Sequence, residues 1–245
     1  MIAQVILHRF AFSNYCEKVN WAADYKSVPY TVREYLPFLH RRPITKLSGQ
    51  ALVPVLEDEE HVVAGSARIV DHLETKPGHR SLFPEDPAER AEAMAWQKRL
   101  DPIGATLRAA LFYDIFEDRD FGFRLLTAGG TGARIAAYKL MFSAMLPKMK
   151  KMLAERASDP ERLRVRVREA LDDVERASSE TGYIVGSRFS IADLTAAALF
   201  FPTRFPEGAP GAAIARGHKV GKAWLRRWEA HPATAFVDRM YAAHR

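Results

Sequence analysis

The spacing of hydrophobic and polar positions changes near residue 80. Before that point, short apolar or alternating runs bounded by turn residues predict strands near residues 2–7, 30–35, 52–56 and 61–64. Apolar residues at helical spacing predict a helix over residues 14–26 and another that Ser66 caps, with Ile69, Val70 and Leu73 on one face. The order is β-α-β, a loop, then β-β-α, with the first two strands parallel across a crossover helix.

From Pro87 onward the sequence shows only helical periodicity, interrupted by glycine and proline clusters. Helices are expected near residues 87–118, 132–154, 159–179, 190–200, 218–230 and 233–243. Residues 77–84 have the composition of a linker. The chain is therefore predicted to hold two domains, residues 1–79 and 87–245.

Proline interrupts the apolar run at residues 52–56. Because proline cannot donate to a sheet ladder, Pro54 belongs at the start or the edge of a strand, and a cis Val53–Pro54 bond suits such a place. Residues 57–60 form a polar hairpin turn, and residues 40–49 a loop that holds no more than a helical turn.

The turn between the first strand and the first helix reads Ser13-Asn-Tyr-Cys16. Asn14 with Glu17 three residues later fits a capping box, and Ser13 lies just outside the first turn. A hydroxyl there lies near free backbone N–H groups and the positive end of the helix dipole, which attract anions and lower the pKa of a nearby thiol. Serine caps are common, so this pattern alone does not separate a capping residue from a catalytic one.

Composition limits the protein class. Among 245 residues, 48% are hydrophobic and 27% charged, as in soluble globular proteins, and no apolar run approaches the length needed to span a bilayer. No secretory signal is visible at the N-terminus. A single cysteine excludes an internal disulfide, argues against a structural zinc site and favours the cytoplasm.

The formal net charge of +6 is mild, and the excess lies in the second part, at residues 162–168 and 216–227. Spread along helices, these cations are interpreted as solvated faces, so neither nucleic acid nor membrane is expected as a partner. Attraction of anionic small molecules stays open.

Four local patterns resemble those of cytosolic glutathione transferases. Ser13-Asn-Tyr-Cys16 stands where that family keeps its catalytic Ser, Cys or Tyr, and Val53-Pro54 resembles its cis-proline loop. Ser66 opens a helix after the fourth strand, and Ser190-Ile-Ala-Asp193 resembles the capping box of the family's core helix. The resemblance implies an α/β thioredoxin-like N-terminal domain (βαβ-ββα), which binds glutathione, and an all-α C-terminal domain.

The resemblance also implies roles for single residues. The backbone of Val53, before Pro54, would pair with the cysteinyl part of glutathione, and Ser66 would take the γ-glutamyl carboxylate. His40 or Arg41 stands where the family often places a cation for the glycyl carboxylate, a chemically sensible partner.

Three residues of the turn are weighed for the thiol chemistry. Glutathione attacks as a thiolate, and one charge-assisted hydrogen bond from Ser13, worth roughly 1.5–3 kcal/mol, together with the helix terminus would lower the thiol pKa from about 8.5 to around 6.5–7. Tyr15 is the rival donor. Cys16 is interpreted first as a small buried side chain and second as a thiol that forms a mixed disulfide with glutathione.

The sequence departs from the family pattern at Gly65. The family usually has an acid there to pair with the γ-glutamyl ammonium, and its loss would cost about 1–2 kcal/mol unless another acid compensates. Leu52 likewise stands where a polar glycyl contact sometimes lies.

The second substrate is expected between Phe12 and the first helices of the helical domain, where Arg108, Leu111 and Phe112 share a helix face with Leu107 and Phe116. Interdomain core is the alternative interpretation of these residues. The chain is thus predicted to be a detoxification transferase that uses glutathione as co-substrate and no metal, conjugating or reducing a small hydrophobic electrophile. A homodimer is expected by resemblance, and the alternative is a non-catalytic protein of the same fold that binds ligands or proteins.

Overall fold

The computed structural model describes residues 5–59, 61–76 and 80–245. Residues 2–4 of the predicted first strand, Glu60 of the predicted turn and residues 77–79 of the predicted linker lie outside these ranges. The first part contains β1 (Val5–Phe10), α1 (Asn14–Tyr25), β2 (Tyr30–Tyr35), α2 (Arg41–Ser48), β3 (Val55–Asp58), β4 (His61–Ala64) and α3 (Ser66–Glu74). The second part contains α4 (Pro87–Ile115), α5 (Arg119–Leu126), α6 (Ala133–Arg156), α7 (Pro160–Ser178), α8 (Ile191–Phe200), the 3-10 turn η1 (Phe201–Thr203), α9 (Ala212–Gly217), α10 (Lys219–Arg226) and α11 (Ala233–His244).

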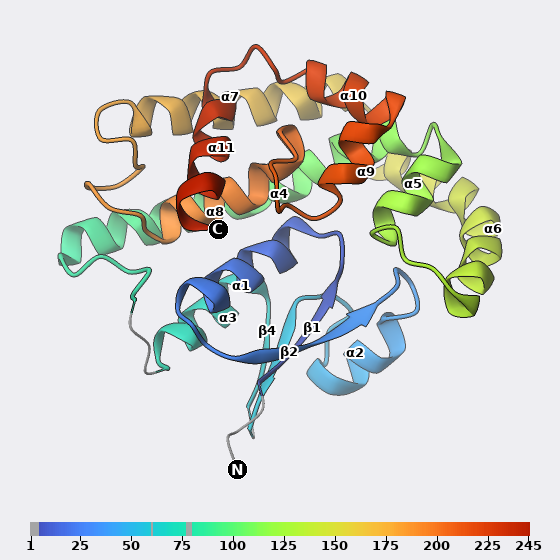
Figure 1. Ribbon diagram of the computed structural model, residues 1–245, viewed down its shortest axis with the longest axis horizontal. Coiled ribbons are helices and arrows are strands. Elements are labelled where there is room, and N and C mark those ends of the chain that lie inside the picture. Colours follow the sequence, from blue (N-terminus) through green and yellow to red (C-terminus); the bar gives the residue numbers. More distant parts are fainter. Residues whose placement is uncertain (1–4, 60, 77–79) are drawn as a thin grey trace.

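The first part is a four-stranded sheet in the order β2-β1-β3-β4, with β1 parallel to β2 and the other neighbours antiparallel. Successive side chains of a strand point to opposite faces. Leu7 and Leu56 therefore join the core that α1 and α3 cover, whereas Val55 packs with Ile44 of α2 on the other face. Figure 1 shows α1 between the sheet and the helical part, with α2 on the far side of the sheet.

The second part is built around α4 and α8, which pack against each other. Helix α4 also packs against α7 (Figure 1). Every residue of α8 is buried. Its N-terminus carries the predicted capping box, in which Ser190 accepts from the Ala192 N–H and Asp193 accepts from the Ser190 N–H at 2.9 Å. No helix in the described ranges combines the length and apolarity needed to cross a bilayer.

Helix α1 also contacts the last helix of the chain. The indole N–H of the fully buried Trp21 donates to the His244 carbonyl at 2.8 Å. The buried Glu17 carboxylate accepts a hydrogen bond from Arg245 Nε at 2.7 Å. A buried carboxylate needs such a charged partner, so the end of α11 is held against the first helix.

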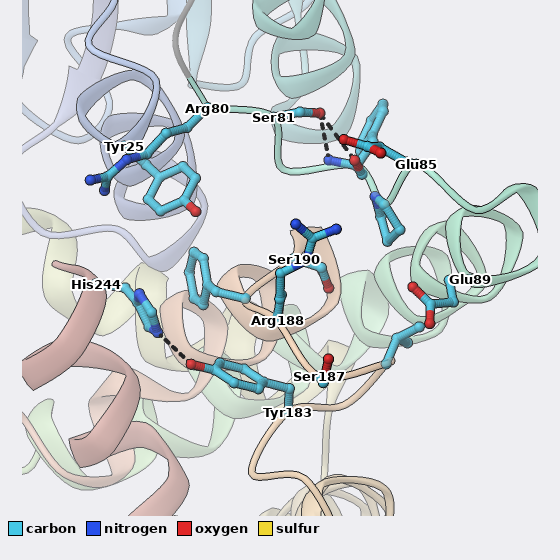
Figure 2. A pocket seen from close by; sticks show the side chains of 14 residues that line it. Tyr25, Arg80, Ser81, Glu85, Glu89, Tyr183, Ser187, Arg188, Ser190 and His244 are labelled. Carbon is cyan, nitrogen blue, oxygen red and sulfur yellow. Dashed lines mark hydrogen bonds between the residues drawn. The ribbon is translucent and has the colours of Figure 1, made fainter.

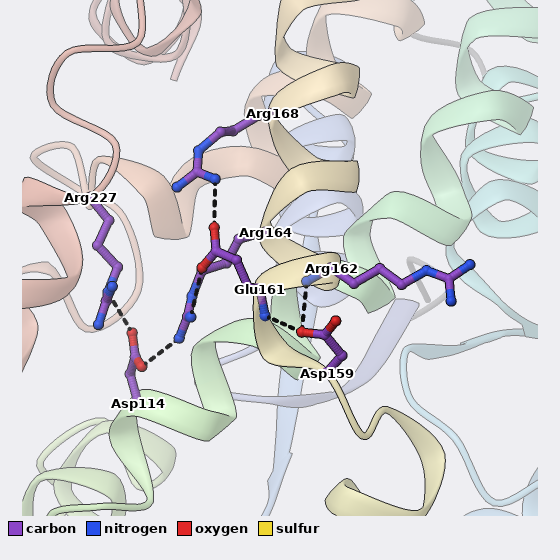
Figure 3. A network of polar contacts seen from close by, with 7 residues as sticks. All are labelled: Asp114, Asp159, Glu161, Arg162, Arg164, Arg168 and Arg227. Atoms are coloured by element: carbon purple, nitrogen blue, oxygen red, sulfur yellow. Dashed lines mark hydrogen bonds and ion pairs between the residues drawn. The ribbon is translucent and has the colours of Figure 1, made fainter.

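A polar network holds α4 to α7 and α10 (Figure 3). Asp114 near the end of α4 accepts from Arg164 Nη2 at 2.8 Å and from Arg227 Nε at 3.1 Å. Glu161, in the first turn of α7, accepts from Arg164 and Arg168. Arg164 is buried, and Asp114 supplies the charge that makes its burial tolerable.

Several predicted boundaries are wrong. Residues 41–48 form the two-turn helix α2, because Ile44 fills the space against Val55. The short helices α5 and α9 were not predicted, although Asp118 caps α5 by accepting from the Phe121 N–H. Strand β3 begins at Val55, after the cis Val53–Pro54 bond that the sequence suggested.

Candidate functional site

The turn after β1 presents Ser13 as the N-cap of α1. Its backbone is extended, with φ of −163°, and its Oγ accepts from the Cys16 N–H at 3.3 Å. The predicted capping box of Asn14 and Glu17 is wrong, because Ser13 holds the capping place and Glu17 is bound to Arg245 instead. The half-buried Ser13 hydroxyl therefore lies at the positive end of α1.

Asn14 joins the turn to the helical part. Its buried side-chain amide donates to the Gly104 carbonyl of α4 at 3.0 Å and to the Leu199 carbonyl of α8 at 3.3 Å. Sequence reasoning took Asn14 only as a capping residue. The signal for its role lies in two distant helices, which local patterns do not reveal.

Cys16 lies inside the domain, 1% exposed. Burial raises the pKa of its thiol to about 11, and the neighbouring Ser13 hydroxyl offsets only part of that rise. The thiol is therefore protonated at neutral pH and shielded from solvent, as expected for a small buried side chain.

Tyr15 lines a pocket of about 470 Å³ between the sheet part and α4. Its hydroxyl donates to the backbone carbonyl of Asp101, and Arg108 lies over its ring, with the guanidinium carbon 5.6 Å from the ring centroid. Burial raises the pKa of Tyr15 to about 12, and the Arg108 charge opposes that rise. The phenol is therefore neutral and already occupied as a donor.

The floor of this pocket is the junction of the cis-proline loop and α3. Val53, Pro54, Gly65 and Ser66 line it, and the Gly65 N–H donates to the Pro54 carbonyl at 3.2 Å. Gly65 is the N-cap of α3 at φ of +96°, in a backbone region that favours glycine. Ser66 is thus the first helical residue and not the cap, which corrects the prediction.

The N-terminus of α3 opens into the pocket without a side-chain cap. Ser66, Ala67 and Arg68 belong to its first turn and line the cavity, and no side chain of the cap residue accepts from them. Free N–H groups and the helix dipole make such a terminus a binding place for an anion.

The pocket also carries charges of both signs. Arg68 and Arg108 line it, together with Asp101 of α4. Asp101 pairs with Lys18 at 3.1 Å, and burial lowers the pKa of this fully buried lysine although the aspartate opposes the effect. Within the described ranges, no cluster of three or more His, Cys, Asp or Glu side chains has the arrangement of a metal site.

Comparisons with known proteins agree with this architecture. Residues 7–81 match the glutathione S-transferase N-terminal domain, and residues 159–227 match the glutathione S-transferase C-terminal domain. Together the two segments span more than half of the 245 residues. The chain belongs to the glutathione S-transferase family.

Individual relatives are distant. A glutathione S-transferase from Pseudomonas putida (strain F1) is 30% identical over 96 residues, which is 39% of this chain and 43% of that protein. The chain thus matches less than half the length of that relative.

Two solved structures show the same fold over nearly the whole chain. A glutathione S-transferase from Methylobacillus flagellatus KT, determined with glutathione bound, has a TM-score of 0.61 at 16% identity and covers 98% of this chain and 95% of its own. The beta-etherase LigF from Sphingobium sp. strain SYK-6 has a TM-score of 0.61 at 21% identity and covers 98% of this chain and 99% of its own. At these identities the likeness establishes the shared glutathione S-transferase fold.

The structure does not bring every residue suggested by the glutathione transferase resemblance to the pocket. The buried His40 is bonded through Nε2 to the Ala51 carbonyl at 3.0 Å, and burial lowers its pKa. Arg41 is exposed in the first turn of α2, and neither residue lines the pocket, whereas Gln50 does. Ser13 is also absent from the lining.

The expected second-substrate residues divide in the same way. Phe12 is buried against Phe201 and Phe205, with ring centroids 5.9 and 6.0 Å away, and Leu111 is buried in the same core. Phe112 packs against this core beside Phe116. Only Arg108 of the predicted set lines the pocket, so Phe12 and Leu111 follow the interdomain-core interpretation.

Proposed function

We propose that the protein is a glutathione-dependent transferase that conjugates the tripeptide thiol to a small hydrophobic electrophile, or uses it to reduce one. The observation that carries this proposal is the composition of the pocket beside the cis-proline loop. An uncapped helix N-terminus, two arginines and one aspartate line the same cavity. Glutathione carries two carboxylates and one ammonium, and these charges complement that lining.

The γ-glutamyl end is assigned to the start of α3. Its carboxylate would accept from the Ser66 hydroxyl and the free N–H groups of the first turn. Gly65 offers no acid for the ammonium, and Asp101, which lines the same pocket, supplies the missing negative charge. The Lys18 ammonium neutralises part of that charge, which predicts modest affinity.

The rest of the tripeptide would lie along the cis-proline loop. Val53 precedes β3, and none of the backbone hydrogen bonds within the described residues uses its N–H or carbonyl. These groups are free to pair with the cysteinyl residue as a short antiparallel bridge. Gln50 lines the pocket in place of His40 and Arg41 and is assigned to the glycyl end.

The bound thiol first loses its proton to solvent, and its sulfur then bonds to the electrophilic atom while a leaving group or a π-electron pair departs. Reduction of an electrophile further requires a second glutathione thiol, which forms the disulfide with the first. Ser13 supports that step, because its hydroxyl and the first N–H groups of α1 stabilise the thiolate and not the thiol. Tyr15 is a poorer donor, since its hydroxyl already donates a hydrogen bond to the Asp101 carbonyl.

The test is a glutathione titration across pH that follows the ultraviolet absorbance of the thiolate. Wild-type protein is expected to give a saturable signal with a depressed thiol pKa. Ser13→Ala is expected to lose the thiol pKa shift, whereas Ser13→Thr, which keeps a hydroxyl, is expected to retain it. Ser179→Ala, at an exposed helix end, is the control and leaves the shift intact. A thiol pKa that stays depressed in Ser13→Ala would remove Ser13 from the mechanism.

A non-catalytic ligand-binding protein is the second candidate, favoured by one observation. Ser13 does not line the pocket, and its Oγ accepts from the Cys16 N–H in its role as the helix cap. Glutathione binding without any change in its thiol pKa would establish this candidate over the transferase.

The proposal includes two expectations taken from the family. A homodimer is expected, and light scattering at several protein concentrations tests it. A cytoplasmic location is expected because a single cysteine forms no internal disulfide and so needs no oxidising compartment, and because glutathione keeps the cytoplasm reducing. Fractionation of cells that express the protein at its natural level tests the second expectation.

A further inference from the structure

A second cavity, of about 590 Å³, lies where the two parts of the chain meet on the linker side (Figure 2). Its walls come from the end of α1, from residues 80–85, from the first turn of α4, from the loop before α8 and from α11. It shares no lining residue with the pocket beside the cis-proline loop. The volume is that of pockets which take small organic molecules.

One wall is aromatic. The Tyr25 ring packs on Phe189 at 5.2 Å, and Phe189 stacks on His244 at 4.2 Å between centroids. The Tyr183 hydroxyl lies 3.2 Å from His244 Nε2 (Figure 2). Burial and the Arg80 charge lower the pKa of His244, which keeps the imidazole neutral. The tilted Tyr25 and Phe189 rings and the His244 imidazole form an uncharged aromatic wall, against which another ring can pack.

Two guanidinium groups flank the Tyr25 ring of this wall, and Figure 2 shows them on opposite sides of it. Arg80 lies over the Tyr25 ring at 5.4 Å. Arg80 and Arg188 both oppose the rise that burial causes in the pKa of the Tyr25 phenol, so both charges are close to it. Figure 2 shows the Arg188 guanidinium in the middle of the cavity. Within the described residues, neither arginine has a carboxylate oxygen within 4.0 Å.

The opposite rim is acidic. Glu85 and Glu89 line it and lie across the cavity from Tyr25 in Figure 2. Glu89 stands against the loop at Gly186, where an added Cβ would come within 2.8 Å of its carboxylate. A second negative charge on a ligand would meet these carboxylates, so the cavity disfavours a dianion.

We propose that this cavity binds a small aromatic monocarboxylate, with the carboxylate on Arg188, the Arg80 charge behind the Tyr25 ring, and the ring of the ligand against Tyr25, Phe189 and His244. A guanidinium fork matches a carboxylate with two parallel hydrogen bonds, and an arginine without a protein partner loses no existing bond when it engages one. The site is separate from the glutathione pocket, so it does not depend on the proposed transferase reaction. Because both parts of the chain line the cavity, a bound ligand also bridges them.

Calorimetric titration with three probes of similar ring size tests this proposal: 2-naphthoate, neutral 2-naphthol and 2,6-naphthalenedicarboxylate. Naphthoate is expected to bind one per chain and at least about tenfold more tightly than naphthol, the difference that one charge-assisted bond contributes. The dicarboxylate is expected to bind more weakly than naphthoate, and Glu89→Gln is expected to reduce that difference. Equal affinities of naphthoate and naphthol, or no naphthoate binding at millimolar concentration, would overturn the proposal.

Variants locate the binding. Arg188→Gln changes an exposed side chain and is expected to weaken naphthoate about tenfold while naphthol is unaffected. Arg176→Gln, an exposed arginine of α7 outside the cavity, is the matched control and leaves both probes unchanged. Loss of naphthoate binding in Arg108→Gln but not in Arg188→Gln, or its displacement by saturating glutathione, would assign the probe to the other pocket and refute this site.

Discussion

The side-chain amide of Asn14 donates to the backbone carbonyl of Gly104 across the boundary between the sheet part and the helical part, at 3.0 Å. The same amide reaches the Leu199 carbonyl, so the first residue of α1 is bonded to the two central helices. The position of Ser13, one residue earlier, therefore depends on α4 and α8.

Replacing Asn14 is expected to destabilise the protein. Asn14→Ala removes two buried hydrogen bonds to carbonyls of α4 and α8, at a cost of about 1–3 kcal/mol in the free energy of unfolding. The nearly isosteric Asn14→Asp is expected to cost more, since a buried carboxylate facing carbonyl oxygens has a raised pKa. The folded state then binds more protons than the unfolded state, so stability falls as pH rises. Urea titrations at pH 5 and pH 8 measure this, and an Asp variant as stable as wild type at pH 8 would contradict it.

Gly65 is required by its backbone conformation. No atom lies within 4 Å of a Cβ built there, so Gly65→Ala has room, but φ of +96° strains any other residue. The expected loss of unfolding free energy is about 1–3 kcal/mol. Gly217→Ala is the control, because that glycine has equal room and lies at the end of helix α9, where alanine is neutral or stabilising by up to about 1 kcal/mol. Similar losses in the two variants would rule out backbone strain at Gly65.

Cys16 is expected to be almost inert toward thiol reagents in the folded protein. Burial raises its pKa to about 11 from an ordinary value of 9.0, so at pH 7.5 the thiolate fraction is lower by about a hundredfold, and burial also shields the sulfur from the reagent. Ellman's reagent measures the rate with and without urea, and Cys16→Ala gives the blank. Because the chain has one cysteine, the reading is unambiguous. Rapid labelling of the folded protein would instead favour thiol reductase chemistry at Cys16.

Asp193 is expected to make stability depend on pH. Burial raises its pKa from 3.8 to about 6, so between these values the folded state binds more protons than the unfolded state. The free energy of unfolding therefore falls as pH rises from about 4 to 6, by about 3 kcal/mol from this group. Asp193→Asn is expected to flatten the slope in that window, whereas Glu155→Gln, at an exposed position of α6, leaves it unchanged. A slope that survives in Asp193→Asn would assign it to another group.

The fold class was predictable from the sequence because it rests on local patterns. Alternation before residue 80, helical periodicity after it, and the Ser190–Asp193 capping box are properties of short segments. The turn at Ser13 and the cis Val53–Pro54 bond were recognisable for the same reason. Short helices such as α5 were missed because two turns of periodicity are too short to stand out from a loop.

The composition of the pocket was only partly predictable. Tyr15 bonds to Asp101, which lies 86 residues away, and the sequence does not show which face of α4 meets the turn. For the same reason Asp101 was missed, and the sequence left Phe12 and Leu111 between a substrate contact and interdomain core, which is where they lie. His40 was placed by its distance from the cis-proline loop, but its bond to Ala51 turns it away from the pocket.

Helix α1 is bonded at its first turn to α4 and α8 and farther along to the end of α11. The sheet part is therefore not a transplantable module. In a chimera that joins it to the helical half of a relative, the Trp21 indole and the Asn14 amide would find backbone carbonyls only where those helices approach α1 equally closely, and the buried Glu17 carboxylate would lack a partner unless a cation ends the chain. Recombination between relatives would have to carry these partner positions across together, so the two halves are constrained to change in step.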